Sequence, residues 1–179
     1  IFRRDVSKEE ALKITERYKE IFKIKDKDEF CQKIFEQVKK DYGYGNVPIS
    51  FQNFTRDKGI NGACNVLHNR IEAKFHNKKQ FLKTMIHEFQ HLKQYEYSYR
   101  TDKKMLVDAF YEKILKKEPQ YLDDMLKLNN LSKSTKNINE IKIETKNKIE
   151  KQLNTLFRDK NIFNKNSENY KQGLKYINN

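Results

Sequence analysis

The chain has 179 residues, 36% of them hydrophobic, which is enough to bury one core with a helical extension. Its two cysteines exclude a disulfide framework, and it contains no run of about 18 apolar residues that would span a membrane. The net charge of +13 favours acidic partners, yet the basic residues are spread along the chain, so charge alone identifies no partner.

The N-terminal half of the chain predicts two helices followed by strands. A capping box begins a helix expected over residues 7–22, and Asp28 is the expected cap of a second helix that ends near residue 41. Beyond that point the apolar period changes from that of a helix to that of a strand. Alternating apolar residues predict strands over residues 47–51, 63–68 and 70–75, the last two as a hairpin or as neighbours.

A central helix is predicted to begin after Asn77, with Gln80 as the partner in a capping box. Two histidines, His87 and His91, lie on one side of this helix. The opposite side is a broad apolar arc, plotted at about 100° per residue, that consists of Phe81, Leu82, Met85, Ile86, Phe89 and Leu92. The helix can therefore bury its apolar side against a sheet while its histidines face a cleft.

Beyond the central helix the pattern is mainly helical. A helix restarts at residue 101 or 102 and stops before Pro119, and a short helix follows to residue 128. A polar loop over 129–137 leads to a long charged helix over 138–156 and to an Asn- and Lys-rich end. The sequence thus predicts an α+β fold, with a small, mostly antiparallel sheet packed on the central helix and additional N- and C-terminal helices.

The spacing His87-Glu88-x-x-His91 places two imidazoles on one face of the central helix, because residues four apart lie nearly above one another. Two imidazoles in this arrangement can share one Zn²⁺ ion. Glu88 lies about 100° further round, where its carboxylate is poorly placed as a ligand and well placed to take a proton from a metal-bound water. A helical histidine is commonly a structural residue, but the predicted helix, its buried arc and the upstream strands all agree with a metal site.

Residues 85–92, Met-Ile-His-Glu-Phe-Gln-His-Leu, follow Gly-Ala-Cys-Asn at 62–65 and an alternating strand. This stretch resembles the catalytic helix of the zincin metallopeptidases, in particular gluzincin-like bacterial and phage-type proteases and toxins. The resemblance covers residues 61–94 and implies a zincin-like peptidase domain over residues 1–128, with 129–179 as a polar helical extension. It also implies an edge strand at 62–68 that holds the substrate backbone in extended form.

The resemblance implies a role for each residue of the motif. His87 and His91 would bind Zn²⁺, and Glu88 would be the general base. The metal would hold and acidify a water, Glu88 would remove its proton, and the hydroxide would attack a peptide carbonyl. The residues expected to contact the protein or peptide substrate lie on the edge strand and are Cys64, Asn65 and His68.

The resemblance also requires a third protein ligand, commonly a Glu on a later helix that is followed four residues on by an Asp. Asp108 matches that Asp, but Lys104 then occupies the ligand position, so the sequence departs from the pattern. Glu112 and Asp108 are the remaining candidates for a third metal ligand. The alternatives are a fold-back of a histidine or a ligand beyond the given sequence, that is, His68, His76 or a residue after Asn179.

The residues therefore predict a zinc-dependent metallopeptidase that hydrolyses peptide bonds of a protein substrate. The alternative is a basic binding module for nucleic acid or an acidic protein, in which the His-Glu-x-x-His motif is degenerate or structural. Nucleic acid could also be a partner of the enzyme, although nothing in the sequence requires it. The sequence leaves the compartment open between the cytoplasm and secretion as an effector.

Overall fold

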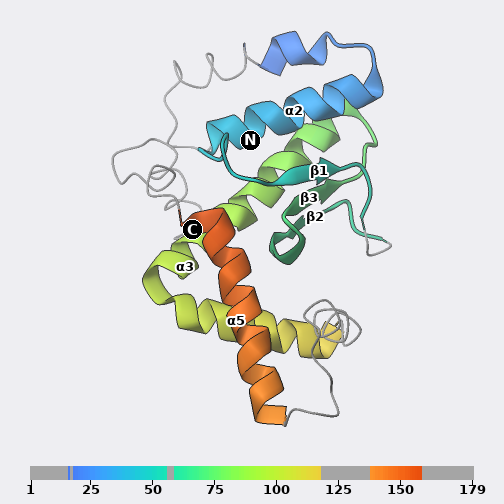
Figure 1. The fold of residues 1–179 in the computed structure, drawn as a ribbon. Helices are drawn as coiled ribbons and strands as arrows, with labels where there is room; N and C mark the ends of the chain where they lie inside the picture. Colours follow the sequence, from blue (N-terminus) through green and yellow to red (C-terminus); the bar gives the residue numbers. More distant parts are fainter. Residues whose placement is uncertain (1–15, 17, 56–58, 118–137, 159–179) are drawn as a thin grey trace. The chain divides into compact units, whose positions relative to one another are not determined.

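The structure is a computed structural model that describes residues 16, 18–55, 59–117 and 138–158 (Figure 1). Its elements, in chain order, are α2 (Lys27–Asp41), β1 (Ser50–Gln52), β2 (Gly62–Asn65), the 3₁₀ turn η1 (Val66–His68), β3 (Arg70–Ala73), α3 (Lys78–Lys117) and α5 (Ile138–Phe157). The predicted α+β class is confirmed. No helix in the described part of the chain is long and apolar enough to cross a membrane.

The chain divides into two compact units. The described residues up to Lys93 belong to the first unit, and those from Gln94 onward belong to the second. The first unit holds α2, the sheet and the N-terminal half of α3, so it contains the whole His-Glu-x-x-His motif. The predicted domain boundary between residues 128 and 129 lies outside the described residues, as do the predicted helix over 119–128 and the Asn-rich end.

Helix α2 begins one residue after Asp26, whose side chain accepts a hydrogen bond of 2.7 Å from the backbone N–H of Glu29. The prediction that Asp28 caps this helix was wrong. Asp28 lies inside the first helical turn, while Asp26 has the extended backbone of an N-cap. The predicted end near Asp41 is confirmed. The buried face of α2 consists of Phe30, Cys31, Ile34, Phe35 and Val38.

The sheet has the strand order β1-β3-β2. Strand β2 runs antiparallel to β3, with Gly62 opposite Ala73, and the 3₁₀ turn η1 connects them. Asn69 closes this turn in the left-handed conformation, with a φ of 54°. The two neighbouring strands predicted upstream of the motif helix are confirmed, but both are shorter than predicted, because Val66–His68 form η1 and β3 ends at Ala73. Strand β1 runs parallel to β3, so the sheet is mixed, with one antiparallel and one parallel pairing.

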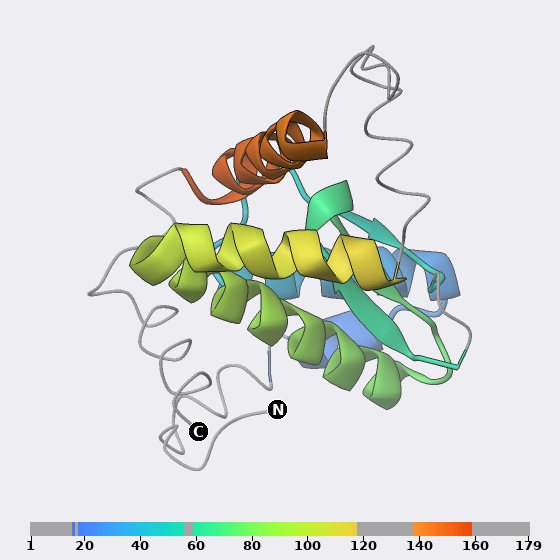
Figure 2. The same ribbon diagram turned by 90° about the horizontal axis from the view of Figure 1, so that it is seen from below.

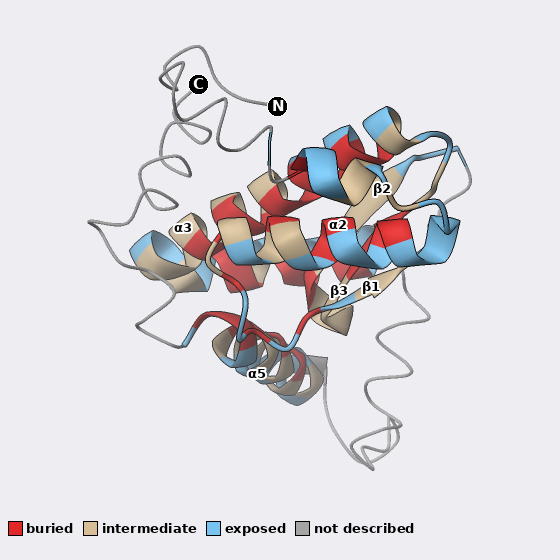
Figure 3. Cartoon of the chain, turned by 90° about the horizontal axis from the view of Figure 1, so that it is seen from above, coloured by how far each residue is buried: buried red, intermediate tan, exposed pale blue. Residues whose placement is uncertain are grey.

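One face of the sheet packs against both α2 and the N-terminal half of α3. Phe51 of β1 stacks on Phe35 of α2 at 5.6 Å between ring centroids, and it meets Phe81 of α3 edge-on at 5.7 Å. In Figures 1 and 2 the strands lie alongside this half of α3, and Figure 3 shows buried residues recurring along α2 and α3. Phe89 completes the core against Phe35 at 5.9 Å.

The continuous ribbon of α3 contains a break at Asp102, whose φ of −152° and ψ of 78° are not helical. The Asp102 side chain accepts a hydrogen bond of 3.1 Å from the N–H of Met105, so it caps the helical segment that follows. The predicted restart at residue 101 or 102 is confirmed. In the second unit both this segment and α5 contribute buried apolar residues, among them Leu106, Phe110, Ile114, Ile149, Leu153 and Leu156.

Candidate metal centre

His87 and His91 lie one helical turn apart on α3, and their Nε2 atoms are separated by 2.9 Å. Two imidazole nitrogens bound to one tetrahedral zinc at about 2.0–2.1 Å lie about 3.3 Å apart. A small rotation of either ring therefore brings both nitrogens to coordination distance of a shared ion. The two rings stand nearly perpendicular, with an interplanar angle of 86°.

The apolar arc of α3 orients these histidines. Met85, Phe89 and Leu92 are fully buried in the first unit, while His87 is exposed and His91 is half-buried. The core contacts of the arc fix the rotation of the helix about its axis, and the histidines are consequently presented on its opposite side. Partial desolvation of its ring, followed by the nearby His91, lowers the pKa of His87, which favours the neutral imidazole that binds metals.

Glu88 is buried, with 5% of its surface exposed, and it lies beside strand β2. A Cβ added at Gly62 would lie 3.2 Å from Oε1 of Glu88 and 2.5 Å from Cγ2 of Thr84. The absence of a side chain at Gly62 therefore lets the strand backbone approach the motif helix. Burial, and then the negative charge of Glu72, raises the pKa of the Glu88 carboxyl to about 7.

Glu72 is a second buried carboxylate near the motif, with 1% of its surface exposed. Arg70 donates to its Oε2 from Nε at 2.8 Å, and Asn65 donates to the same atom from Nδ2 at 3.0 Å. These two donors compensate the burial of the charge. Sequence reasoning missed Glu72, because it stands at a polar position of an alternating strand, where a carboxylate is ordinarily solvated.

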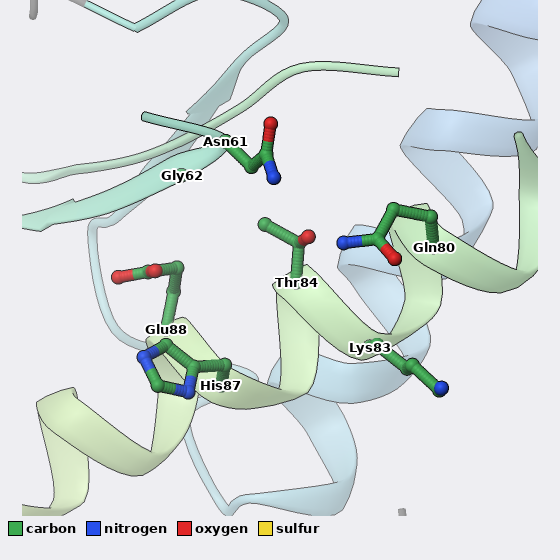
Figure 4. Close-up of a pocket in the computed structure, with 7 residues that line it drawn as sticks. All are labelled: Asn61, Gly62, Gln80, Lys83, Thr84, His87 and Glu88. Atoms are coloured by element: carbon green, nitrogen blue, oxygen red, sulfur yellow. The ribbon is translucent and has the colours of Figure 1, made fainter. Parts of the chain in front are cut away.

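A pocket of about 340 Å³ lies between the motif helix and the start of β2. Figure 4 shows His87, Glu88 and Thr84 on the helix, with Asn61 and Gly62 on the segment across from them. Gln80 and Lys83 complete its lining. The pocket thus combines one candidate ligand, one candidate base and a strand backbone.

The residues predicted to contact the substrate are Cys64, Asn65 and His68. They follow the lining residues Asn61 and Gly62 in the sequence, but they are not among the residues that line the pocket. Cys64 and Asn65 belong to β2, and the Asn65 amide is directed to Glu72. His68 ends η1. Asn61 and Gly62 line the pocket in their place, a role that the sequence signalled only as turn chemistry before the strand.

The described residues do not assign a third ligand, because among them no group of three or more His, Cys, Asp or Glu side chains could hold a metal ion. Asp108 and Glu112 belong to the second unit. There, Asp108 accepts a hydrogen bond of 2.7 Å from Lys146, which holds the pKa of Asp108 below its usual value, and Glu112 is exposed. His76, an alternative candidate, lies 3.0 Å from Oδ1 of Asn61 through its Nε2.

Comparisons of the chain with protein-family models, with curated proteins and with solved structures find no match.

Proposed function

We propose that this protein is a zinc-dependent metallopeptidase that hydrolyses peptide bonds of a protein substrate. The observation that carries the proposal is the pair of Nε2 atoms of His87 and His91, 2.9 Å apart, next to a buried Glu88 that shares a pocket with His87. Each part of this arrangement corresponds to a requirement of metal-assisted hydrolysis.

His87 and His91 would hold the zinc through their Nε2 atoms. When bound, zinc would supply a Lewis acid that polarises a carbonyl oxygen and lowers the pKa of water. The imidazoles suit this role because they are neutral nitrogen donors on a rigid helical turn. The separation of their nitrogens is within about half an ångström of that in a tetrahedral site.

Glu88 would move the proton. As a carboxylate it accepts a proton from the attacking water, and as a carboxylic acid it returns that proton to the leaving amine. Its burial excludes competing solvent and keeps the pKa high enough for the protonated form to be accessible. A dication beside it would lower that pKa, because an opposite charge favours the carboxylate.

Strand β2 would hold the substrate in an extended conformation. The Asn61 carbonyl accepts from Lys74, and Ala63 lies opposite Glu72, so these alternate residues face β3. The N–H and C=O groups of Gly62, between them, are directed to the other edge of the strand. A peptide paired with that edge would run past the pocket that contains Glu88.

Metal analysis tests the ligand assignment. Full-length protein prepared without chelator should contain about one zinc per chain, held by His87, His91 and a third ligand that the described residues do not assign. His87→Ala and His91→Ala should each lose that zinc, and Lys25→Ala, a change at an exposed residue outside the pocket, should retain it as the control. A wild-type protein without stoichiometric zinc would overturn the proposal.

Proteolysis of fluorescently labelled casein, a general protein probe, tests the role of Glu88. Glu88→Gln should retain the zinc and lower the cleavage rate by about 100-fold or more, because it removes the general base and keeps the shape. Glu20→Gln, which alters an exposed carboxylate paired with Lys23, is the control and should leave the rate unchanged. Zinc-independent binding to nucleic acid that weakens steeply with salt, without cleavage, would favour a basic binding module instead.

A further inference from the structure

We infer that the groove between α2 and β1 docks an extended, acidic peptide segment of a partner protein. This groove, of about 800 Å³, is bounded by α2 on one side and by residues 45–51 on the other. It will be called the α2–β1 groove. Because the strand order is β1-β3-β2, it lies at the opposite edge of the sheet from the β2 edge, and the inference does not depend on the proposed peptidase activity.

The backbone edge of β1 is suited to pairing with an extended chain. The N–H of Ser50 donates to the carbonyl of Asn69 at 2.9 Å, which directs Ser50 toward β3. Successive residues of a strand direct their backbone groups to opposite edges, so the N–H and C=O of Phe51 face away from β3. Among the described strands none pairs with that edge. An added strand would supply its missing partners.

The floor of the groove is apolar. Phe35 and Ile49 are buried, and the half-buried Phe51 stacks on Phe35. Alternate side chains of a paired peptide point to the same face, so every second residue of the occupant would lie against these rings. Apolar residues at alternate positions are therefore the expected contact set.

The rim of the groove is basic. Lys39 and Lys40 line it together with one carboxylate, Glu36. That carboxylate is paired with Lys33 at 3.7 Å and accepts from Gln32 at 3.3 Å, so the two rim lysines leave the groove a net positive charge. Lys39 lies 5.7 Å from the centroid of the Phe35 ring, where burial lowers the pKa of its ammonium group. A carboxylate from an occupant would compensate that desolvation and pair with Lys40.

These features together favour an acidic peptide over nucleic acid. A phosphate backbone would satisfy the two lysines, but it would leave the apolar floor and the directional groups of Phe51 unmatched. An extended chain that alternates carboxylates with apolar side chains matches the two rim lysines, the apolar floor and the backbone groups of Phe51. This match identifies the class of occupant.

Fluorescence anisotropy with defined probes tests the inference. The probe is a fluorescein-labelled peptide of about ten residues in which Glu and Val alternate, which suits strand addition. It should bind the full-length wild-type protein, and Lys39→Glu/Lys40→Glu should weaken its affinity by about tenfold, because two rim charges are reversed. Lys25→Glu, which reverses one charge at an exposed lysine outside the groove, is the control for each of the two substitutions. It should leave the affinity within about twofold.

Two further probes separate strand pairing from charge attraction. The same peptide with N-methyl groups on alternate residues should lose binding, because it cannot donate to the edge of β1. A Lys-Val peptide should not bind. Unchanged affinity in the double variant, or equal binding of the N-methylated peptide, would overturn the inference.

A second copy of this chain is the competing occupant, and sedimentation velocity distinguishes it. The wild-type protein should remain monomeric at the concentrations used for anisotropy. A dimer that dissociates in Lys39→Glu/Lys40→Glu would assign the groove to self-association and would overturn the peptide assignment. Circular dichroism of each variant should match the wild type, since both lysines lie on the rim.

Discussion

The Nε2 atoms of His87 and His91 lie 2.9 Å apart, within hydrogen-bond distance and close to the spacing of two nitrogens that share one zinc ion. Holding two nitrogens this close leaves little conformational entropy to lose on chelation, provided that the helix itself is rigid. The buried residues Met85, Phe89 and Leu92 supply that rigidity.

Zinc should therefore stabilise the folded protein against heat. At a free zinc concentration about 100 times the dissociation constant, binding adds about 2.7 kcal/mol to the free energy of unfolding, which corresponds to a rise of roughly 5–10 °C in Tm. Differential scanning fluorimetry with and without EDTA measures the shift. His87→Ala/His91→Ala should abolish it, and Lys25→Ala, at an exposed residue outside the pocket, should not; a shift that survives in the double variant would place the ion elsewhere.

Gly62→Ala should destabilise the first unit through a steric clash with the motif helix. The new Cβ would lie 2.5 Å from Cγ2 of Thr84, which is shorter than any ordinary contact, so the strand or the helix must move. We expect a loss of about 1–3 kcal/mol in the free energy of unfolding, measured by urea denaturation.

A double variant tests the cause of that loss. Thr84→Ser removes Cγ2 and keeps the hydroxyl, so Gly62→Ala/Thr84→Ser should recover part of the stability. The recovery should be partial, because Oε1 of Glu88 and the Glu72 carbonyl would still lie 3.2 and 3.1 Å from the added atom. Strictly additive effects of the two substitutions would contradict a direct clash.

Arg70→Met should lower the free energy of unfolding more than the double variant Arg70→Met/Glu72→Gln, in which the charge of the Glu72 partner is removed as well. The single variant removes the guanidinium that compensates the buried carboxylate of Glu72, and we expect a cost of about 2–4 kcal/mol. In Arg70→Met/Glu72→Gln no uncompensated charge remains, so the cost should be smaller. Urea denaturation of both variants checks the order, and equal losses would show that the ion pair is not the cause.

The two cysteines should differ in their reaction with a thiol reagent such as DTNB. Neither forms a disulfide, and burial, followed by the charge of Asp28, raises the pKa of Cys31 to about 11. Only the thiolate reacts, so at pH 8 Cys31 should remain unmodified in the folded protein, and its reactivity should rise as the pH approaches 11. Cys64 is half-exposed and should react first.

Single variants assign the two phases of that reaction. Cys64→Ser should remove the fast phase, and Cys31→Ser should remove only the phase that appears in denaturant. Rapid modification of Cys31 in the native protein at pH 8 would contradict its burial in α2.

The amino-acid sequence by itself determined the motif helix and the face that presents the histidines. Those features depend on contacts between residues a few positions apart, and the helical period is enough to predict them. The same local logic predicted the end of α2 at Asp41 and the restart of the helix at residue 101 or 102. It failed at the cap of α2, because Asp26 and Asp28 are both chemically suitable and only the backbone conformation distinguishes them.

Only the tertiary structure decided what surrounds the motif. The parallel pairing of β1 with β3 and the close approach of Gly62 to Thr84 and Glu88 join segments whose contact no local period specifies. The burial of Glu72 beside Asn65 depends on the register of β2 against β3. Strand order and register arise from the whole packed core, since the same alternating sequence can pair in several ways. For this reason the sequence identified the candidate metal ligands, and the fold identified the pocket that His87 and Glu88 share with β2.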